Sequence, residues 1–562
     1  MASTAVLLAV TAGVAQAADT AKDQQILQEL SDLKAKMWDF DAMAARIQQL
    51  ETEMQANAAK ATAAKEEAAS AKKEADDAST TTAGASKVLD KLSRGQLQIG
   101  HTNVNFSGFI EANANHRQHN ELSSAHGSGL ATPFPVQAQY HTDEFRSNPP
   151  PTRMGFGTTS DYFEDVRIKS KWEWDMSAGS NAAGTANGSN WIPRMRHAMA
   201  EVDLASGWHF VGGQTYSLTV SSGNAVGGDG SDSPNLAWSL LPGTELTSAP
   251  DDGMLAGDGA FRNVQLRVVK ELTSNMALAA SVETNTLNWS GYHGSSSVST
   301  GLNTTAANTV VVPVTSNASF TSGTTPYTAF GTMPEIISKI GYDPTTDYHF
   351  EAWGAFRQYK DVAGAASNLP DVGSTYTGGM GASTFIKLIP SKLDLHVGIG
   401  YGSIGSLVDG AIPDVTYEAS GKPVAVFEKT LWGEVTVHPN RNLDLLFQAG
   451  IEQGEKAGVS GNSTATAFGY GNPYGSGGSV GNIACMTPST SSLTATCKQD
   501  TKTVWNVAFT PIWRIFNNSA HGHLDFLPQV QYWRRTLFDD QYGYGPHASN
   551  WSIDLAIRYF PF

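Results

Sequence analysis

The alternation of charged and apolar side chains between Asp165 and Met176 constrains the fold of this chain more than any other feature. Apolar side chains take one set of alternate positions, namely Val166, Ile168, Trp172, Trp174 and Met176. Charged side chains take the other set, namely Asp165, Arg167, Lys169, Lys171, Glu173 and Asp175. A period of two places the sets on opposite faces of a β-strand. Because a charged face is costly in a dry core, the pattern is typical of a barrel wall between lipid and a water-filled lumen.

Similar alternation recurs along the chain and predicts about sixteen strands. They are expected to begin near Asn103, Thr152, Phe163, Pro193, Gly207, Gly259, Met276, Met333, Tyr348, Thr375, Lys392, Val424, Leu443, Val504, His521 and Asn550. Long connections, such as 219–258 and 452–503, alternate with tight turns, such as 343–347 and 390–391. Membrane barrels have short periplasmic turns and long outer loops. We therefore predict an all-β transmembrane barrel of about 16 antiparallel strands over residues 96–562, and the even strand number places both chain ends on the periplasmic side.

A segment with helical periodicity precedes the predicted barrel. Apolar residues recur at spacings of four and three, namely Ile26, Leu30, Leu33, Met37, Phe40, Ala44, Ile47 and Met54, and the register continues through Ala58, Ala61, Ala68 and Ala75. This heptad seam predicts an α-helical coiled coil and spacer over residues 18–95, which we expect to end at Thr80–Ala85. The alternative is a single amphipathic helix lying on the barrel or on the cell wall.

The first 17 residues resemble an export signal. The apolar run from Val6 to Val14 ends in Ala15-Gln16-Ala17, so we expect a signal peptide over residues 1–17 and a mature chain from Ala18. No Lys or Arg precedes Lys22, so the basic region of such a signal lies upstream or is missing. No later run of 18 or more apolar residues indicates a transmembrane helix. The net charge of −16 argues against nucleic acid as a partner.

The chain has two cysteines, Cys485 and Cys497, in one segment rich in Gly, Ser and Thr. In an exported protein this pair predicts a disulfide within a loop. A metal site at the pair is disfavoured because no His or second Cys pair lies nearby. No Cys-x-x-Cys-His, Gly-x-Ser-x-Gly or His-Glu-x-x-His motif occurs, so neither a cofactor nor enzymatic activity is expected.

The third long connection is the expected constriction of the channel. It is rich in glycine and carries the acidic residues Asp229, Asp232, Glu245, Asp251, Asp252 and Asp258. The basic ladder expected to face it consists of Arg153, Arg167, Lys169, Lys171, Arg194 and Arg196. Opposed charges would orient dipolar solutes, and arginine suits carboxylates. The alternatives are a solvated surface loop or a calcium site for the acids, and ion pairs with Asp165, Glu173 and Asp175 for the ladder.

Within the ladder, Arg194 and Arg196 are the residues most expected to contact solute. The reason is their place in the sequence, because no acidic residue follows them before Glu201.

In several of these segments the sequence resembles the DcaP-like trimeric porins. The shared features are the coiled coil, residues 152–161 (TRMGFGTTSD), the charged strand 166–176, residues 193–198 (PRMRHA) and residues 212–216 (GGQTY). The resemblance implies a homotrimer of sixteen-stranded barrels that passes small organic anions. We therefore expect a multi-pass porin in the bacterial outer membrane, in contact with lipopolysaccharide, with a periplasmic N-terminal segment that can reach peptidoglycan. The alternatives are a structural anchor tethered to the cell wall and a soluble periplasmic binding module, and the charged strand faces argue against the second.

Overall fold

The computed structural model divides the chain into two units, Met1–Asp90 and Lys91–Phe562. It describes residues 21–93, 96–121, 132–148, 152–163, 165–176, 193–222, 255–259, 262–285, 333–360, 373–408, 411–418, 422–463, 467–475, 480–488, 495, 497–518 and 522–561. The expected signal peptide over residues 1–17 lies outside these ranges.

A single helix, α1 (Ala21–Ser93), forms the described part of the first unit. The helix predicted from the heptad seam is confirmed, and seam residues such as Ile26, Leu30 and Leu33 are exposed on it. The predicted end at Thr80–Ala85 is wrong, since α1 continues through Gly84 to Ser93. A glycine inside a helix costs only about 1 kcal/mol relative to alanine, which is too little to end a helix of this length. Among the described residues, no helix is both long and apolar enough to span a membrane.

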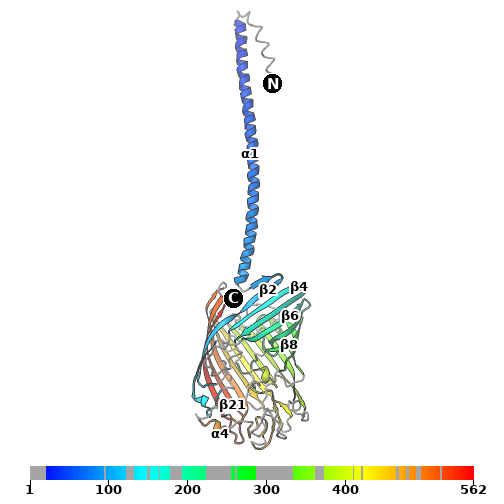
Figure 1. Ribbon diagram of the computed structural model, residues 1–562, viewed down its shortest axis with the longest axis vertical. Helices are drawn as coiled ribbons and strands as arrows, with labels where there is room; N and C mark the ends of the chain where they lie inside the picture. Colours follow the sequence, from blue (N-terminus) through cyan, green and yellow to red (C-terminus); the bar gives the residue numbers. More distant parts are fainter. Residues whose placement is uncertain are drawn as a thin grey trace. The chain divides into compact units, whose positions relative to one another are not determined.

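The second unit is an antiparallel sheet that closes on itself (Figure 1). Its strands are β1 (Gln96–Ile99), β2 (Thr102–Arg117), β3 (Glu144–Asn148), β4 (Arg153–Phe163), β5 (Val166–Asp175), β6 (Arg194–Leu204), β7 (Trp208–Tyr216), β8 (Arg262–Thr273), β9 (Met276–Glu283), β10 (Glu335–Thr345), β11 (Tyr348–Lys360), β12 (Ser374–Ile389), β13 (Leu393–Gly402), β16 (Glu428–Asn440), β17 (Leu443–Gly454), β20 (Thr501–Asn518), β21 (Gly522–Leu537) and β22 (His547–Phe560).

The first long strand, β2, closes the barrel. Its residues 102–109 pair with β4, and its residues 110–117 pair with β22. Strand β3 pairs only with β2, on the same edge of β2 as β4. Strand β1 also pairs only with β2, on the same edge of β2 as β22. Of the 18 strands in the described sheet, β1 and β3 therefore extend the lines of β22 and β4, and the other sixteen form the closed barrel. The predicted strand number and antiparallel order are confirmed.

The connections alternate in length as the sequence predicts. The short turns cover residues 164–165, 205–207, 274–275, 346–347, 390–392, 441–442 and 519–521. Longer connections lie between them, and the described parts hold further elements: η2 (Ala138–His141), η3 (Gly405–Leu407), β14 (Val415–Tyr417), β15 (Pro423–Ala425), β18 (Ala457–Ser460), β19 (Phe468–Tyr470) and α4 (Asn482–Cys485). The start of β2 and the end of β22 both lie at the short-turn end of the barrel (Figure 1).

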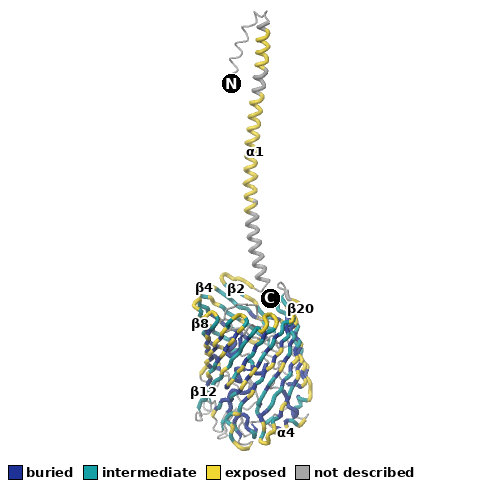
Figure 2. Tube along the Cα trace, turned by 180° about the vertical axis from the view of Figure 1, so that it is seen from behind, coloured by how far each residue is buried: buried dark blue, intermediate teal, exposed yellow. Residues whose placement is uncertain are grey.

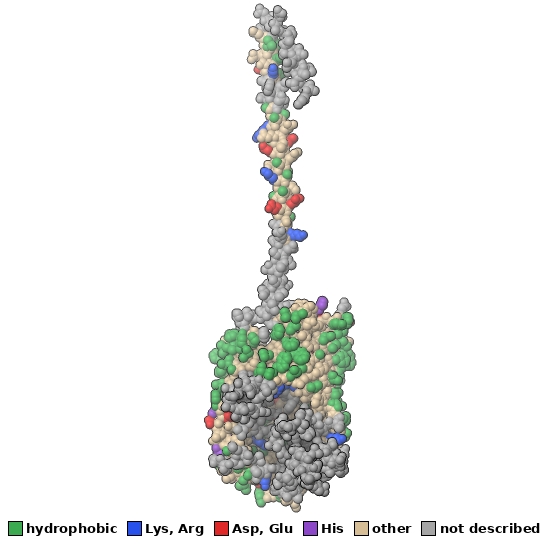
Figure 3. Space-filling model, in the orientation of Figure 1, with side chains coloured by type: hydrophobic (Ala, Val, Ile, Leu, Met, Phe, Trp, Pro, Cys, Tyr) green, Lys and Arg blue, Asp and Glu red, His purple; other side chains and the backbone are tan. Residues whose placement is uncertain are grey.

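The two faces of each strand differ in burial and chemistry. Buried and exposed residues alternate along the strands (Figure 2), as in β22, where Leu555 and Ile557 are exposed while Asp554 and Arg558 are buried. Within the described part of the barrel unit, the buried polar side chains of the strands pair with one another and with the inward-folded connections, so they point into the lumen. The outer surface carries extended patches of hydrophobic side chains (Figure 3). An apolar outside around a polar inside is the arrangement of a membrane-spanning barrel.

Candidate functional site

The lumen is lined by charged and polar side chains drawn from nearly every strand. Buried examples are Glu111, Arg117, Asp175, Arg196, Glu201, Arg267, Glu283, Lys339, Glu351, Arg357, Glu434 and Glu452. On β5 the exposed Trp172 and Ile168 lie on the outside, while Glu173 and Asp175 lie on the lumen side. The orientation predicted for this strand is therefore the one observed.

The third long connection turns into the lumen as soon as it leaves β7. Lys339 of β10 donates a hydrogen bond from Nζ to the carbonyl oxygen of Val220 at 2.8 Å. The backbone N–H of Ser222 donates to Oε1 of Glu351 on β11 at 3.0 Å. The hydroxyl of Ser221 lies 2.8 Å from Nε2 of His396 on β13. These contacts hold the start of the connection against the inner wall formed by β10–β13.

The end of the same connection lies against another part of the wall. The N–H of Ala256 donates to Oδ1 of Asn506 on β20 at 3.0 Å, and the N–H of Gly257 donates to Oε1 of Glu452 on β17 at 2.9 Å. Gly450 of β17 lies so close to Ala256 that any side chain at position 450 would clash with the carbonyl oxygen of Ala256. Seven strands separate β7 from β17 in either direction round the barrel. A connection that begins at β7 and touches β17 therefore crosses the lumen.

The described parts of the sixth long connection, residues 403–408, 411–418 and 422–427, also lie inside the barrel. Ile404, Leu407 and Ile412 are almost fully buried, and the guanidinium of Arg357 hydrogen-bonds the carbonyl oxygen of Ser403 at 2.8 Å. The N–H of Ala411 donates to Oε2 of Glu452 at 3.0 Å, so one carboxylate holds both connections. This inward fold was not among the features expected from the sequence. Its signal was the cluster of apolar residues in a connection, which an outer loop in water would not need.

Most of the acidic residues expected in the constriction lie outside the described part of the chain. These are Asp229, Asp232, Glu245, Asp251 and Asp252. The sixth, Asp258, is half-buried at the docked end of the connection, where its carboxylate accepts the N–H of Gly259 at 2.9 Å. The expectation of calcium in this connection therefore remains a prediction.

Two members of the basic ladder, Arg194 and Arg196, take part in a hydrogen-bond network that joins β5, β6 and β7. Asp175 accepts two hydrogen bonds from Arg194, at 3.0 and 2.6 Å, and one from Arg196 at 2.9 Å. Arg196 also donates to Glu173 at 2.7 Å and to the Tyr216 hydroxyl at 2.7 Å. Arg196 is buried, whereas 46% of the Arg194 side chain is exposed. Of these two arginines, Arg194 therefore offers the guanidinium that a solute can reach.

The remaining members of the ladder are also paired or stacked. Arg167 donates to Asp161 at 2.7 Å, and Lys169 lies 3.0 Å from Glu201 and 2.7 Å from Asp203. Lys171 lies 3.7 Å from Glu173. Arg153 lies over the ring of Phe109 at 5.4 Å from its centroid. Ion pairs with Glu173 and Asp175, which were the alternative interpretation of the ladder, are present.

No acidic residue follows Arg194 and Arg196 in the chain before Glu201, but two acids, Glu173 and Asp175, lie beside them in space. The register of β5 and β6 places Asp175 directly opposite Arg194. A bulge shifts the pairing between Glu173 and Trp174, and it brings Arg196 within reach of both acids. The register is set by turn and bulge geometry, which the alternation of side chains does not reveal.

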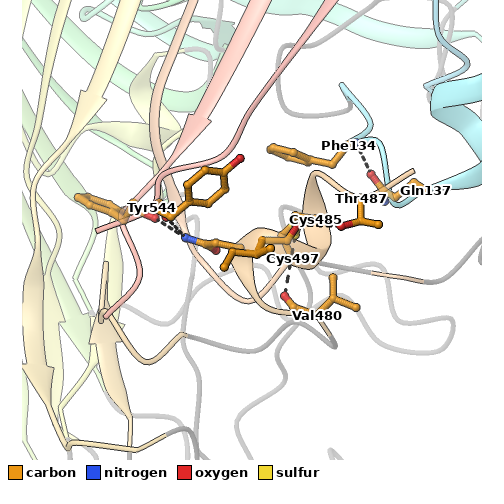
Figure 4. Close-up of a disulfide and its surroundings, with 10 residues drawn as sticks. Phe134, Gln137, Val480, Cys485, Thr487, Cys497 and Tyr544 are labelled. Carbon is orange, nitrogen blue, oxygen red and sulfur yellow. Dashed lines mark hydrogen bonds between the residues drawn. A yellow bond between two sulfur atoms is a disulfide. The ribbon is translucent and has the colours of Figure 1, made fainter. Parts of the chain in front are cut away.

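A disulfide joins Cys485 and Cys497 within the seventh long connection, with Cα atoms 5.7 Å apart (Figure 4). The carbonyl oxygen of Cys485 accepts the N–H of Val136 from the first connection at 3.0 Å. Phe134 and Val136 pack there with Ala495, Leu537 and Ala548. The first and seventh connections are thus fixed to one another at the end of the barrel opposite the short turns.

A closed sixteen-stranded barrel with a polar lumen, an apolar outside and a connection across its interior defines the porin class of fold. No family model and no curated protein sequence matches this chain. Among solved structures, the outer membrane channel DcaP of Acinetobacter baumannii matches with a TM-score of 0.52 and 15% identity, over 82% of this chain and 98% of that chain. The resemblance inferred from the sequence is thereby confirmed at the level of the fold.

Two other solved structures are similar at lower scores. The anion-selective porin from Comamonas acidovorans matches with a TM-score of 0.40 and 10% identity, over 82% of this chain and 99% of that chain. OmpT of Vibrio cholerae matches with a TM-score of 0.40 and 9% identity, over 83% of this chain and 99% of that chain. What this chain shares with the DcaP channel is the fold of an outer-membrane β-barrel channel.

Proposed function

We propose that this protein is a porin of the bacterial outer membrane that lets small polar solutes diffuse passively, with a preference for organic anions such as carboxylates. The observation that carries the proposal is the third connection, which leaves β7 and whose described ends are fixed to the lumen wall at β11 and at β17, the strand opposite β7. A segment that crosses a wide barrel narrows the aqueous path and places it against the remaining wall. The wall formed by β4–β6 carries the basic ladder.

Arg194 is the member of the ladder that we assign to direct contact with the solute. Its guanidinium already binds a carboxylate in bidentate fashion, that of Asp175, and about half of the side chain remains exposed. A solute carboxylate has the same geometry as the Asp175 side chain and competes for the same donors. Arg196 stabilises the pair of Arg194 and Asp175, because it donates hydrogen bonds to both Asp175 and Glu173.

The proposal includes the organisation of the whole molecule. We place residues 1–17 in a signal peptide, the segment of residues 18–95 that contains α1 in the periplasm, and the barrel of residues 96–562 in the membrane as part of a homotrimer. Exposed seam residues of α1, such as Ile26, Leu30 and Leu33, support an assembly through the helix, because other copies of the helix would cover them from water.

The ion selectivity of the double variant Arg194→Ala, Arg196→Ala tests the proposal. Reversal potentials in planar bilayers, measured across a salt gradient, should shift towards lower anion over cation permeability. A matched variant, Arg167→Ala, removes a half-exposed arginine paired only to Asp161 in the described structure, near the short-turn end of β5, and should shift the potential less. An unchanged reversal potential in the double variant would refute the assignment of these arginines.

The alternative is a structural anchor whose barrel does not conduct and whose helix binds the cell wall. The exposed seam of α1 is equally consistent with that function, but the anchor predicts no current through the purified protein.

A further inference from the structure

A group of acidic residues and one histidine lies on the lumen face beside the short turn between β6 and β7. Glu201 and Asp203 are two residues apart on β6, so they share a face, and His209 of β7 lies directly opposite Asp203 in the register. One ligand atom from each of the three residues lies within 4.8 Å of the others. Gly207 has a positive φ of 76°, which lets the chain reverse between β6 and β7 and brings the two strands together here.

The orientation of His209 is fixed from both sides of its ring. Nδ1 lies 2.7 Å from Oδ1 of Asp203, and Nε2 lies 3.1 Å from Oε1 of Glu271 on β8. A carboxylate that accepts the N–H from one ring nitrogen leaves the lone pair of the other nitrogen available, and metal-binding histidines are usually oriented in this way. Glu271 can therefore hold the Nε2–H while Nδ1 faces Asp203 and Glu201.

A cation already occupies the space between the two carboxylates of β6. The ammonium group of Lys169 lies 3.0 Å from Glu201 and 2.7 Å from Asp203. The side chain of Lys169 is partly exposed and has four rotatable methylenes, so it can move into the lumen. A divalent ion would supply two positive charges where the ammonium group of Lys169 now supplies one.

Two other hairpins at the same end of the barrel carry a similar histidine without the third carboxylate. His349 lies between Asp343 and Glu351, and His438 lies between Asp444 and Asp394. In each case the imidazole separates its two acidic partners. Within the described residues, only the β6–β7 hairpin brings a histidine and two carboxylates close enough to share one ion.

We propose that Glu201, Asp203 and His209 form a binding site for a divalent transition-metal ion such as Zn²⁺. Glu271 acts as the positioning residue for His209, and Lys169 occupies the site in the absence of the ion. A nitrogen and two carboxylate ligands suit Zn²⁺, whereas Ca²⁺ and Mg²⁺ prefer oxygen ligands alone. The site faces the lumen, so the ion can reach it from water. The proposal is independent of the solute preference of the channel.

Calorimetric titration of ZnCl₂ into the detergent-solubilised full-length protein, free of affinity tags, tests this site. The variants His209→Ala and Asp203→Asn should bind Zn²⁺ at least about tenfold more weakly than the unaltered protein, and Glu271→Gln should weaken binding within the range of about 10- to 100-fold. His438→Ala is the matched control, because it removes a histidine between two acids at a comparable hairpin, and it should bind as the unaltered protein does.

The variant Lys169→Met separates this site from a purely structural ion-pair network. It removes the competing cation, so Zn²⁺ affinity should rise, whereas a network without a metal function would lose stability and gain no affinity. The heat-modifiable migration of the barrel in gels reports folding of each variant. Binding that is unchanged in His209→Ala, or absent from both the unaltered protein and Lys169→Met, would overturn the proposal.

Discussion

Glu452 of β17 holds two inward-folded connections at once. Its fully buried carboxylate accepts the N–H of Gly257 at 2.9 Å from the third connection and the N–H of Ala411 at 3.0 Å from the sixth. Hydrogen bonds to a buried carboxylate are worth about 2 kcal/mol each. This one side chain therefore determines much of the shape of the lumen near β17.

The substitution Glu452→Ala should loosen the constriction without unfolding the barrel. We expect larger fluctuations of the open-channel current and an altered mean conductance, because both connections lose an anchor to the wall. The matched control is Asp444→Ala on the same strand, whose buried carboxylate is bonded, among the described residues, to His438 and Arg514 of the wall. Equal current noise in the two variants would show that Glu452 is not the anchor.

At the scale of single residues, the sequence was sufficient to predict orientation but not partners. The alternation from Asp165 to Met176 predicts which side chains of β5 enter the lumen, because the strand has a period of two. It does not predict that Asp175 lies opposite Arg194 or that Glu452 meets Gly257, because these contacts depend on register and on the path of long connections.

At the scale of elements, α1 exposes apolar side chains to water along one stripe of the helix. Ile26, Leu30 and Leu33 are 57%, 58% and 68% exposed. The double variant Leu30→Asp, Leu33→Asp should lower the temperature at which the full-length oligomer dissociates in detergent, because it places charge in the seam. The off-seam variant Gln28→Asp, Ser31→Asp adds the same charge and should have little effect. Native mass spectrometry during heating gives the readout, and equal dissociation temperatures would contradict a role for the seam.

The strand boundaries could be predicted closely, and the connections could not. All sixteen predicted starts lie near an observed strand, since turn residues and changes of period mark them. The short strand β3 was not expected, because it continues the line of β4 along β2 and only that pairing defines it. The inward fold of the sixth connection was also not predicted, since it depends on buried partners such as Arg357 of β11, which is 46 residues from Ser403 in the sequence.

At the scale of the molecule, an apolar outer surface implies a penalty for charge on that surface. Ile557 of β22 is 49% exposed on the lipid side. The substitution Ile557→Arg should lower the free energy of unfolding in lipid vesicles by up to about 2–4 kcal/mol, depending on its depth in the bilayer. Ile557→Ala removes apolar contact without adding charge and should cost less. Denaturant titration in vesicles measures both, and an equal cost for the two variants would contradict a lipid-facing position.

The central claim, that the lumen is a water-filled path through a membrane, is tested most directly by single-channel recording of the purified full-length protein in planar bilayers. We predict stepwise, ohmic currents, grouped in threes if the barrels assemble as trimers. Protein that is shown to be folded and inserted, by heat-modifiable migration and by protection from protease, but that gives no current above that of bare lipid would contradict the channel and favour the anchor.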